Sequence, residues 1–78
     1  MTIIQRIKEC DSGKVAAWEN HKNGKRMEVR RSIFWTRRFP NYLTMYYTNG
    51  DLVDGSNGLS LKTAAREVQC WLNRGGNE

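Results

Sequence analysis

Apolar and polar side chains alternate with a period of two over much of the first 54 residues, and this period is typical of β-strands. The alternation predicts five strands, at residues 2–8, 15–22, 25–39, 42–48 and 51–54. It is imperfect in the first of them, where Ile3, Ile4 and Ile7 are the apolar positions. We therefore expect residues 2–8 to form a strand, with a short helix as the alternative.

Turn residues separate the predicted strands. Asn23-Gly24 and Asn49-Gly50 predict two-residue hairpins, because a type I′ turn needs positive φ at both central positions. Proline cannot donate to a sheet ladder, so Phe39-Pro40-Asn41 predicts the end of the longest strand. The chain is therefore expected to form an antiparallel meander.

The first hairpin also predicts which side chains share a face. Counting outward from Asn23-Gly24 places Lys22 opposite Lys25 and Trp18 opposite Val29, so that Trp18, Met27 and Val29 lie on one apolar face. Alternation extends this predicted face to Ile33, Trp35, Leu43, Met45 and Tyr47.

The C-terminal part of the chain changes to a helical period. Its apolar residues follow the spacing i, i+3, i+4, i+7, i+10 and i+11: Leu61, Ala64, Ala65, Val68, Trp71 and Leu72. Ser60 is a suitable N-cap residue and Gly75 a suitable residue just past the helix end. We expect this helix to cover the apolar face of the sheet. The predicted fold class is α+β: an antiparallel β-meander of four to five strands with one C-terminal helix packed on one face. We expect residues 1–74 to form a single domain and residues 75–78 to be a disordered tail.

Composition narrows the choice of partner. The 78 residues carry 13 Lys and Arg against 8 Asp and Glu, for a net charge of +5, which favours an anionic partner. No apolar run is long enough for a membrane span, which takes about 18 residues or more, and the N-terminus does not resemble a signal peptide. Cys10 and Cys70 therefore predict reduced thiols in a cytoplasmic protein.

The face opposite the helix is the predicted binding surface. Arginines would supply donors for phosphate and aromatic rings would stack on bases, and a two-stranded ribbon can enter a DNA major groove. We expect a non-enzymatic nucleic-acid-binding module that prefers DNA to RNA. An ordinary polar sheet face and a homodimer through the same rings are the alternatives left open. The predicted contact residues are Arg26, Arg30, Phe34, Arg37, Arg38, Tyr42 and Tyr46.

Residues that could support catalysis are few and scattered. His21 is the single histidine, and no serine, cysteine or carboxylate lies at a spacing that suggests a catalytic pair. Cys10 and Cys70 do not form a CxxC or a Cys/His pattern that would hold zinc. No enzyme activity, cofactor or metal is predicted.

Two resemblances bear on function. The segment YLTMYYTNGDLVDGSNGLSLKTAAREVQCWL resembles the strand–turn–strand–helix order of the DNA-binding domains of phage-type integrases, including their Ser/Thr-x-x-x-Ala helix opening at Ser60 to Ala64. This resemblance implies DNA binding. In size and architecture, the chain is also similar to small phage and mobile-element proteins, among them anti-CRISPR inhibitors. The second resemblance implies an alternative function: a phage-encoded inhibitor, anti-CRISPR or another anti-defence protein, that docks on a host protein or nucleoprotein complex.

Overall fold

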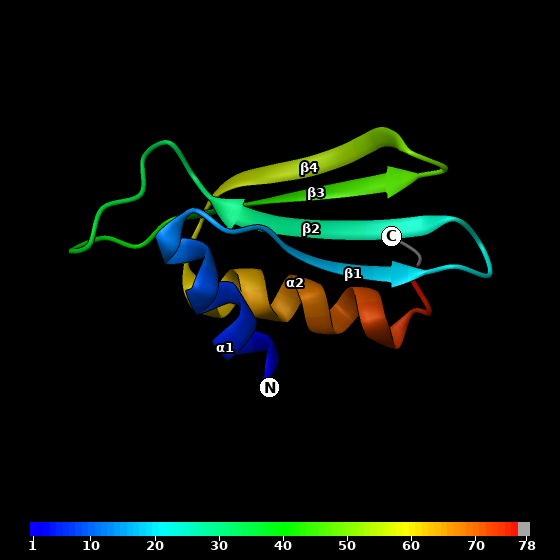
Figure 1. The fold of residues 1–78 in the computed structure, drawn as a ribbon, viewed down its shortest axis with the longest axis horizontal. Coiled ribbons are helices and arrows are strands. Elements are labelled where there is room, and N and C mark those ends of the chain that lie inside the picture. Colours follow the sequence, from blue (N-terminus) through cyan, green and yellow to red (C-terminus); the bar gives the residue numbers. More distant parts are fainter. Residues whose placement is uncertain (77–78) are drawn as a thin grey trace.

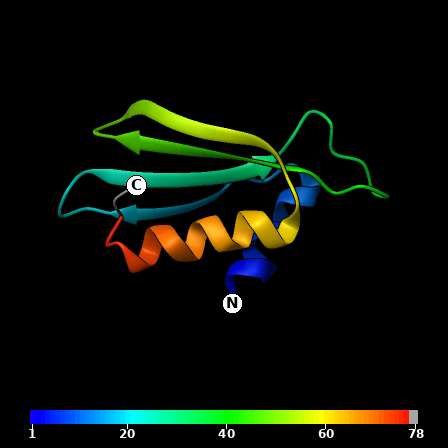
Figure 2. The same cartoon turned by 180° about the vertical axis from the view of Figure 1, so that it is seen from behind.

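The computed structural model, which describes residues 1–76, contains a four-stranded antiparallel sheet in the meander order β1-β2-β3-β4. Two helices and a short 3-10 helix lie together against one face of this sheet (Figure 1, Figure 2). The elements in chain order are α1 (Ile3–Lys8), η1 (Glu9–Ser12), β1 (Ala16–Asn20), β2 (Lys25–Arg31), β3 (Tyr42–Thr48), β4 (Asp51–Leu59) and α2 (Leu61–Asn73). The predicted α+β class, with a C-terminal helix on a meander sheet, is confirmed.

The ends of α2 follow from local chemistry. Ser60 is the N-cap, and its hydroxyl accepts a hydrogen bond from the Thr63 amide at 3.2 Å. At the other end, Gly75 has φ of 65°, and the Gly76 amide donates to the Trp71 carbonyl at 2.9 Å. This is a Schellman cap, which needs a residue in the left-handed region and therefore favours glycine. Gly75 and Gly76 thus close the helix. Residues 75–78 were predicted to be a disordered tail, but Gly75 and Gly76 are ordered by this cap, and residues 77 and 78 lie outside the described residues.

Residues 3–8 form a helix, so the predicted N-terminal strand is wrong and the helical alternative is confirmed. Thr2 and Gln5 form a capping box, in which each side chain accepts a hydrogen bond from the other residue's amide. The box satisfies two free amides at the helix start, which an isoleucine-rich strand would not do. Ile7 is fully buried on the sheet side of α1, whereas Ile4 stays 45% exposed.

The β1–β2 register differs by two residues from the predicted one. Trp18 pairs with Met27 and Asn20 with Lys25, because residues 21–24 form a four-residue loop in place of a two-residue turn. A shift of two residues keeps every side chain on its predicted face, since the side-chain period of a strand is also two. Trp18, Met27 and Val29 therefore share the face that the helices cover, as predicted.

The two faces of β3 are the reverse of the prediction. Tyr42 and Thr44 are buried toward the helices, whereas Leu43 and Met45 lie on the open side. The physical reason is that β2 ends at Arg31, and residues 32–41 form a loop in place of the predicted strand. The register of β3 is then decided by its pairing with β2 and not by continuous alternation through the loop.

The polar tips of the inward-facing β3 residues reach carboxylates on other elements. The Tyr42 hydroxyl donates to Asp11 Oδ1 at 2.7 Å, and the Thr44 hydroxyl donates to Glu67 Oε2 at 2.8 Å. Tyr46 also donates to Glu67, at 3.2 Å. Burial of these hydroxyls is therefore accompanied by hydrogen bonds, which is the condition for burying a polar group without a large penalty.

β4 runs to Leu59 and so is longer than the predicted strand at residues 51–54. Two irregularities in its pairing with β3 accommodate the extra residues. A Cβ at Gly55 would lie 2.7 Å from the Thr44 carbonyl oxygen, so only glycine allows this close pairing. The buried core between the sheet and the helices is formed by Ile7, Cys10, Ala16, Met27, Val29, Tyr42, Ala64, Val68 and Trp71.

Candidate functional site

The outer face of the sheet, defined as the face opposite the helices, carries two of the predicted contact arginines. Arg26 and Arg30 flank Val29 and Met27 on β2, and both point away from the core. Each of them is paired with Glu28: Arg26 Nε lies 2.9 Å from Oε2, and an Arg30 guanidinium nitrogen lies 3.3 Å from Oε1. Arg26 also forms an ion pair with Glu19 on β1.

This pairing removes the basic character that the sequence predicted for the face. Arg26 and Arg30 contribute two positive charges, and Glu19 and Glu28 contribute two negative charges. The hydrogen bond to Glu28 is the main cause of the raised pKa of Arg26. The outer faces of β1 and β2 together therefore carry a neutral network of ion pairs, and its arginines already have carboxylate partners.

The aromatic residues predicted for this face lie elsewhere. Tyr42 is 1% exposed and Tyr46 packs against the core, both on the helix side of the sheet. Burial, followed by the hydrogen bond to Asp11, raises the pKa of Tyr42 to about 12. The prediction that Tyr42 and Tyr46 present stacking rings on the open face is wrong, because the inner face of β3 carries them. The ring that does lie on the outer face is Tyr47, which was predicted to be in the core.

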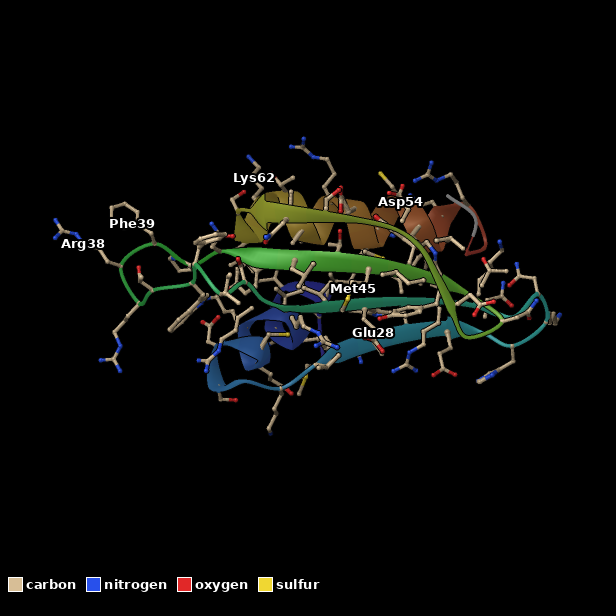
Figure 3. The ribbon with its side chains drawn as sticks, turned by 90° about the horizontal axis from the view of Figure 1, so that it is seen from above. Glu28, Arg38, Phe39, Met45, Asp54 and Lys62 are labelled. Atoms are coloured by element: carbon tan, nitrogen blue, oxygen red, sulfur yellow. The ribbon has the colours of Figure 1, made fainter. Side chains whose placement is uncertain are left out.

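The other three predicted contact residues come together in the 32–41 loop, which joins β2 to β3. Phe34, Arg37 and Arg38 are all exposed in this loop, which extends beyond the ends of the strands (Figure 1). Arg38 and Phe39 lie at the far end of the molecule, well away from Glu28 and Met45 on the sheet (Figure 3).

Besides the predicted contact residue Phe34, the loop exposes two large apolar side chains that the sequence analysis did not predict to be exposed, Ile33 and Phe39. Ile33 is 90% exposed, Phe39 is 70% exposed and Phe34 is 65% exposed. The predicted core position of Ile33 is therefore wrong. Phe39, which was considered only as part of a turn, presents an exposed ring. Isolated exposed apolar residues are ordinary, but three within seven positions of one protruding loop form a concentrated surface.

Backbone hydrogen bonds give the loop a defined shape. The Ser32 amide donates to the Asn41 carbonyl at 2.8 Å and closes the base of the loop. At the tip, the Thr36 amide donates to the Phe39 carbonyl at 3.3 Å, and the Phe39 amide donates to the Thr36 hydroxyl at 3.0 Å. Arg37 and Arg38 are the two residues between these partners. The tip is therefore a tight turn that presents two arginines.

Trp35 attaches the loop to the body of the protein. Its indole Nε1 donates to Asp11 Oδ1 at 3.0 Å, and its ring packs against the core. The Arg31 guanidinium lies 5.3 Å from the centroid of the same ring and donates to the Asp11 carbonyl at 2.8 Å. Asp11 is another residue whose role the sequence did not reveal, because its partners are 20 to 31 positions away.

Arg37 and Arg38 differ from the sheet arginines in their surroundings. Within residues 1–76, neither of them forms an ion pair with a carboxylate. The Arg38 guanidinium instead lies 5.9 Å from the centroid of the Phe39 ring. The tip of the loop thus combines uncompensated positive charge with the exposed ring of Phe39.

The residues considered for catalysis remain apart from one another. His21 is exposed in the β1–β2 loop beside Glu19, with 3.4 Å between His21 Nε2 and Glu19 Oε2. Cys10 is buried and donates to the Val29 carbonyl, and burial raises the pKa of its thiol. Among residues 1–76, no group of three or more His, Cys, Asp and Glu side chains is placed to hold a metal ion.

Within residues 1–76, no helix has the length and apolar character that crossing a membrane requires.

Comparison of the chain with protein-family models, with curated proteins and with solved structures gives no match. The resemblances to integrase-type DNA-binding domains and to small phage inhibitors therefore stay predictions from the sequence.

Proposed function

We propose that this protein is a non-enzymatic nucleic-acid-binding module whose contact surface is the 32–41 loop. The observation that supports this proposal is the presence of Arg37 and Arg38, free of carboxylate partners within residues 1–76, at the tip of a protruding and internally hydrogen-bonded loop. Arginine supplies five donors in a planar fork that matches phosphate oxygens. The exposed rings of Phe34 and Phe39 supply apolar contacts to bases.

The charge distribution favours the loop over the sheet. An arginine gains affinity for a phosphate by releasing the counterions that the nucleic acid holds. Arg26 and Arg30 would first have to break their ion pairs with Glu28, so most of this gain would be lost. Arg37 and Arg38 have no such competitor among the described residues. The net charge of +5 would attract a polyanion to the molecule as a whole.

A titration with charge-reversal variants tests this proposal. Fluorescence anisotropy would follow binding to random duplex and single-stranded DNA and RNA at two salt concentrations. Arg37→Glu and Arg38→Glu should each weaken binding by about tenfold and reduce its salt dependence. The matched control is Lys22→Glu, which makes the same change in net charge in the exposed β1–β2 loop at the other end of β2.

The comparison separates a localised contact from a general charge effect. If Lys22→Glu weakened binding as much as Arg38→Glu, the loop would not be the contact surface. If the wild-type protein bound no nucleic acid at low salt, the proposed function would be wrong.

A second candidate function is an inhibitor that docks on a host protein or nucleoprotein complex, such as an anti-defence protein encoded by a phage. The observation that favours it is the exposure of Ile33, Phe34 and Phe39, because aromatic and arginine side chains dominate protein–protein interfaces. Its test is inhibition of a purified RNA-guided nuclease by the wild type and by Phe34→Ala. Inhibition that is unchanged when Arg38→Glu weakens the protein's own nucleic-acid binding would favour this candidate over the first.

A further inference from the structure

We propose that the 32–41 loop is a wedge for duplex DNA, in which Phe34 and Phe39 enter the minor groove and separate a base-pair step while Arg37 and Arg38 hold the flanking backbone. This inference rests on the proposed nucleic-acid function and names its substrate. Proteins that bend DNA from the minor groove use apolar side chains in this way, together with cationic side chains that follow the groove.

A wedge must hold apolar side chains clear of the protein that carries them. Phe34 and Phe39 are 65% and 70% exposed, whereas the other large rings nearby are used internally. The Trp35 indole donates a hydrogen bond to Asp11, and the Arg31 guanidinium lies over its ring. Tyr42 is buried. Within the loop, the Trp35 ring therefore serves as an anchor, whereas the rings of Phe34 and Phe39 are available to a partner. Figure 3 shows Phe39 and Arg38 together at the extreme end of the molecule.

A wedge must also resist being pushed back. Opening a base step requires a few kcal/mol, and a floppy loop would in addition lose conformational entropy when it binds. The 32–41 loop is closed at its base between Ser32 and Asn41, tied to η1 through Trp35, and turned at its tip between Thr36 and Phe39. The backbone of the loop is thus held in shape before a partner arrives.

The position of the charges agrees with groove insertion. Arg37 and Arg38 lie between the two phenylalanines in sequence, and the Arg38 guanidinium is next to the Phe39 ring. An apolar tip and its cations would therefore reach the DNA together. The minor groove is the appropriate groove, because its negative potential attracts arginine.

The sheet gives the reason for preferring duplex to single-stranded nucleic acid. Proteins that bind single strands line a basic groove with successive rings on which bases stack. In this protein, the rings of Tyr42 and Tyr46 face the helices and the sheet arginines are paired with glutamates, so a continuous track is missing from the described surface. The contact is restricted to one protruding loop, which suits a single base step better than an extended strand.

The experiment uses the full chain and a short duplex with a central TA step, which is among the steps that unstack most easily. Donor and acceptor dyes at the duplex ends report bending, and 2-aminopurine beside the TA step reports unstacking. Anisotropy on the same samples reports binding. We expect wild-type protein to bend the duplex by about 20° or more and to raise the 2-aminopurine signal.

Variants distinguish the wedge from the proposed function itself. Phe34→Ala and Phe39→Ala should abolish the bend and the 2-aminopurine change while weakening binding by only about tenfold. Leu52→Ala is the matched control, because it removes an apolar side chain that is 60% exposed on β4; it should leave all three signals unchanged. Circular dichroism would show that each variant is folded, which is expected because all three positions are exposed.

Other results would contradict the wedge alone or the proposed function as well. Binding of the duplex without bending or unstacking would overturn the wedge and leave the proposed function standing. Tighter binding to single strands than to the duplex would do the same. No binding of either would overturn both, and apolar contacts of the loop with a protein pocket would then become the leading explanation for Phe34 and Phe39.

Discussion

Asp11 accepts a hydrogen bond from the indole of Trp35, with 3.0 Å between Asp11 Oδ1 and Trp35 Nε1. The same carboxylate oxygen accepts from the Tyr42 hydroxyl at 2.7 Å. The Asp11 side chain on η1 therefore binds Trp35 in the 32–41 loop. It also binds Tyr42, the first residue of β3, which follows directly after the loop. The shape of the candidate binding surface depends on this side chain, although it lies outside the loop.

Replacement of Asp11 should destabilise the fold and loosen the loop. Asp11→Ala leaves the half-buried Trp35 indole and the buried Tyr42 hydroxyl without their acceptor, which should lower the free energy of unfolding by about 1–3 kcal/mol. Urea denaturation would measure the loss, and hydrogen exchange of residues 32–41 would measure the loosening. Asp51→Ala, at an exposed position on β4, is the control and should change neither. Equal effects of the two substitutions would contradict the role of Asp11 as an anchor.

Tyr42 should make stability sensitive to alkaline pH. Its pKa is raised from about 10 to about 12 in the folded state, mainly by burial, so the folded protein resists losing this proton. The corresponding stabilisation is complete below pH 10 and is lost as the pH rises from 10 to 12. Tyr42→Phe should therefore show a shallower fall in the free energy of unfolding across this range than the wild type. Denaturation series at several pH values would measure it, with Tyr47→Phe on the outer face as the control. Parallel curves for wild type and Tyr42→Phe would refute the assignment.

The ion-pair network of the outer face should contribute little to stability. Glu28→Gln removes the carboxylate shared by Arg26 and Arg30. The arginine side chains are 38% and 45% exposed and the Glu28 side chain is 14% exposed. Because solvent reaches both guanidinium groups and screens the pairs, we expect a loss of about 1 kcal/mol or less. The larger effect of Glu28→Gln should be on binding: Arg26 and Arg30 lose their shared carboxylate partner, so nonspecific DNA binding at low salt should increase. Glu9→Gln makes the same change in net charge on η1, away from the network, and should have a smaller effect on binding. No difference between these two variants would mean that the pairing does not mask the arginines.

The two cysteines should differ in reactivity. Cys70 is exposed on α2, whereas Cys10 is fully buried and its thiol pKa is raised by burial. A thiol reagent such as DTNB should label one cysteine rapidly in the native protein and the second only as the protein unfolds. Cys70→Ser should remove the rapid phase. Rapid labelling of two thiols in the native wild type would show that the contact between η1 and β2 opens readily.

Local chemistry decided several features that the sequence predicted correctly. Ser60 caps α2 because its hydroxyl accepts from an amide three residues away, and Gly75 ends α2 because the cap requires positive φ. The bounds of β3 and the shared face of Trp18, Met27 and Val29 follow from a two-residue period. All of these depend on neighbours in the chain or in one hairpin, so the sequence alone contains the information.

The candidate site illustrates the opposite case. A two-residue period continued from Arg31 to Phe39 predicts a strand that presents Phe34 and Arg38 on a sheet face, but the chain leaves the sheet at Arg31. Phe34, Arg37 and Arg38 were recognised as contact residues, yet their common position in one protruding loop could not be derived. Whether a chain segment stays in a sheet depends on the strand beside it, and alternation within the segment does not contain that information.

By itself, the sequence determined a small basic α+β chain with a meander sheet and a capped C-terminal helix, because periodicity and capping are local properties. Only the tertiary structure decided which face of β3 is buried, which arginines are paired with Glu28 and how Asp11 holds Trp35. These outcomes depend on contacts between residues far apart in the chain. Burial and charge pairing there are determined by how the strands, helices and loop pack against one another.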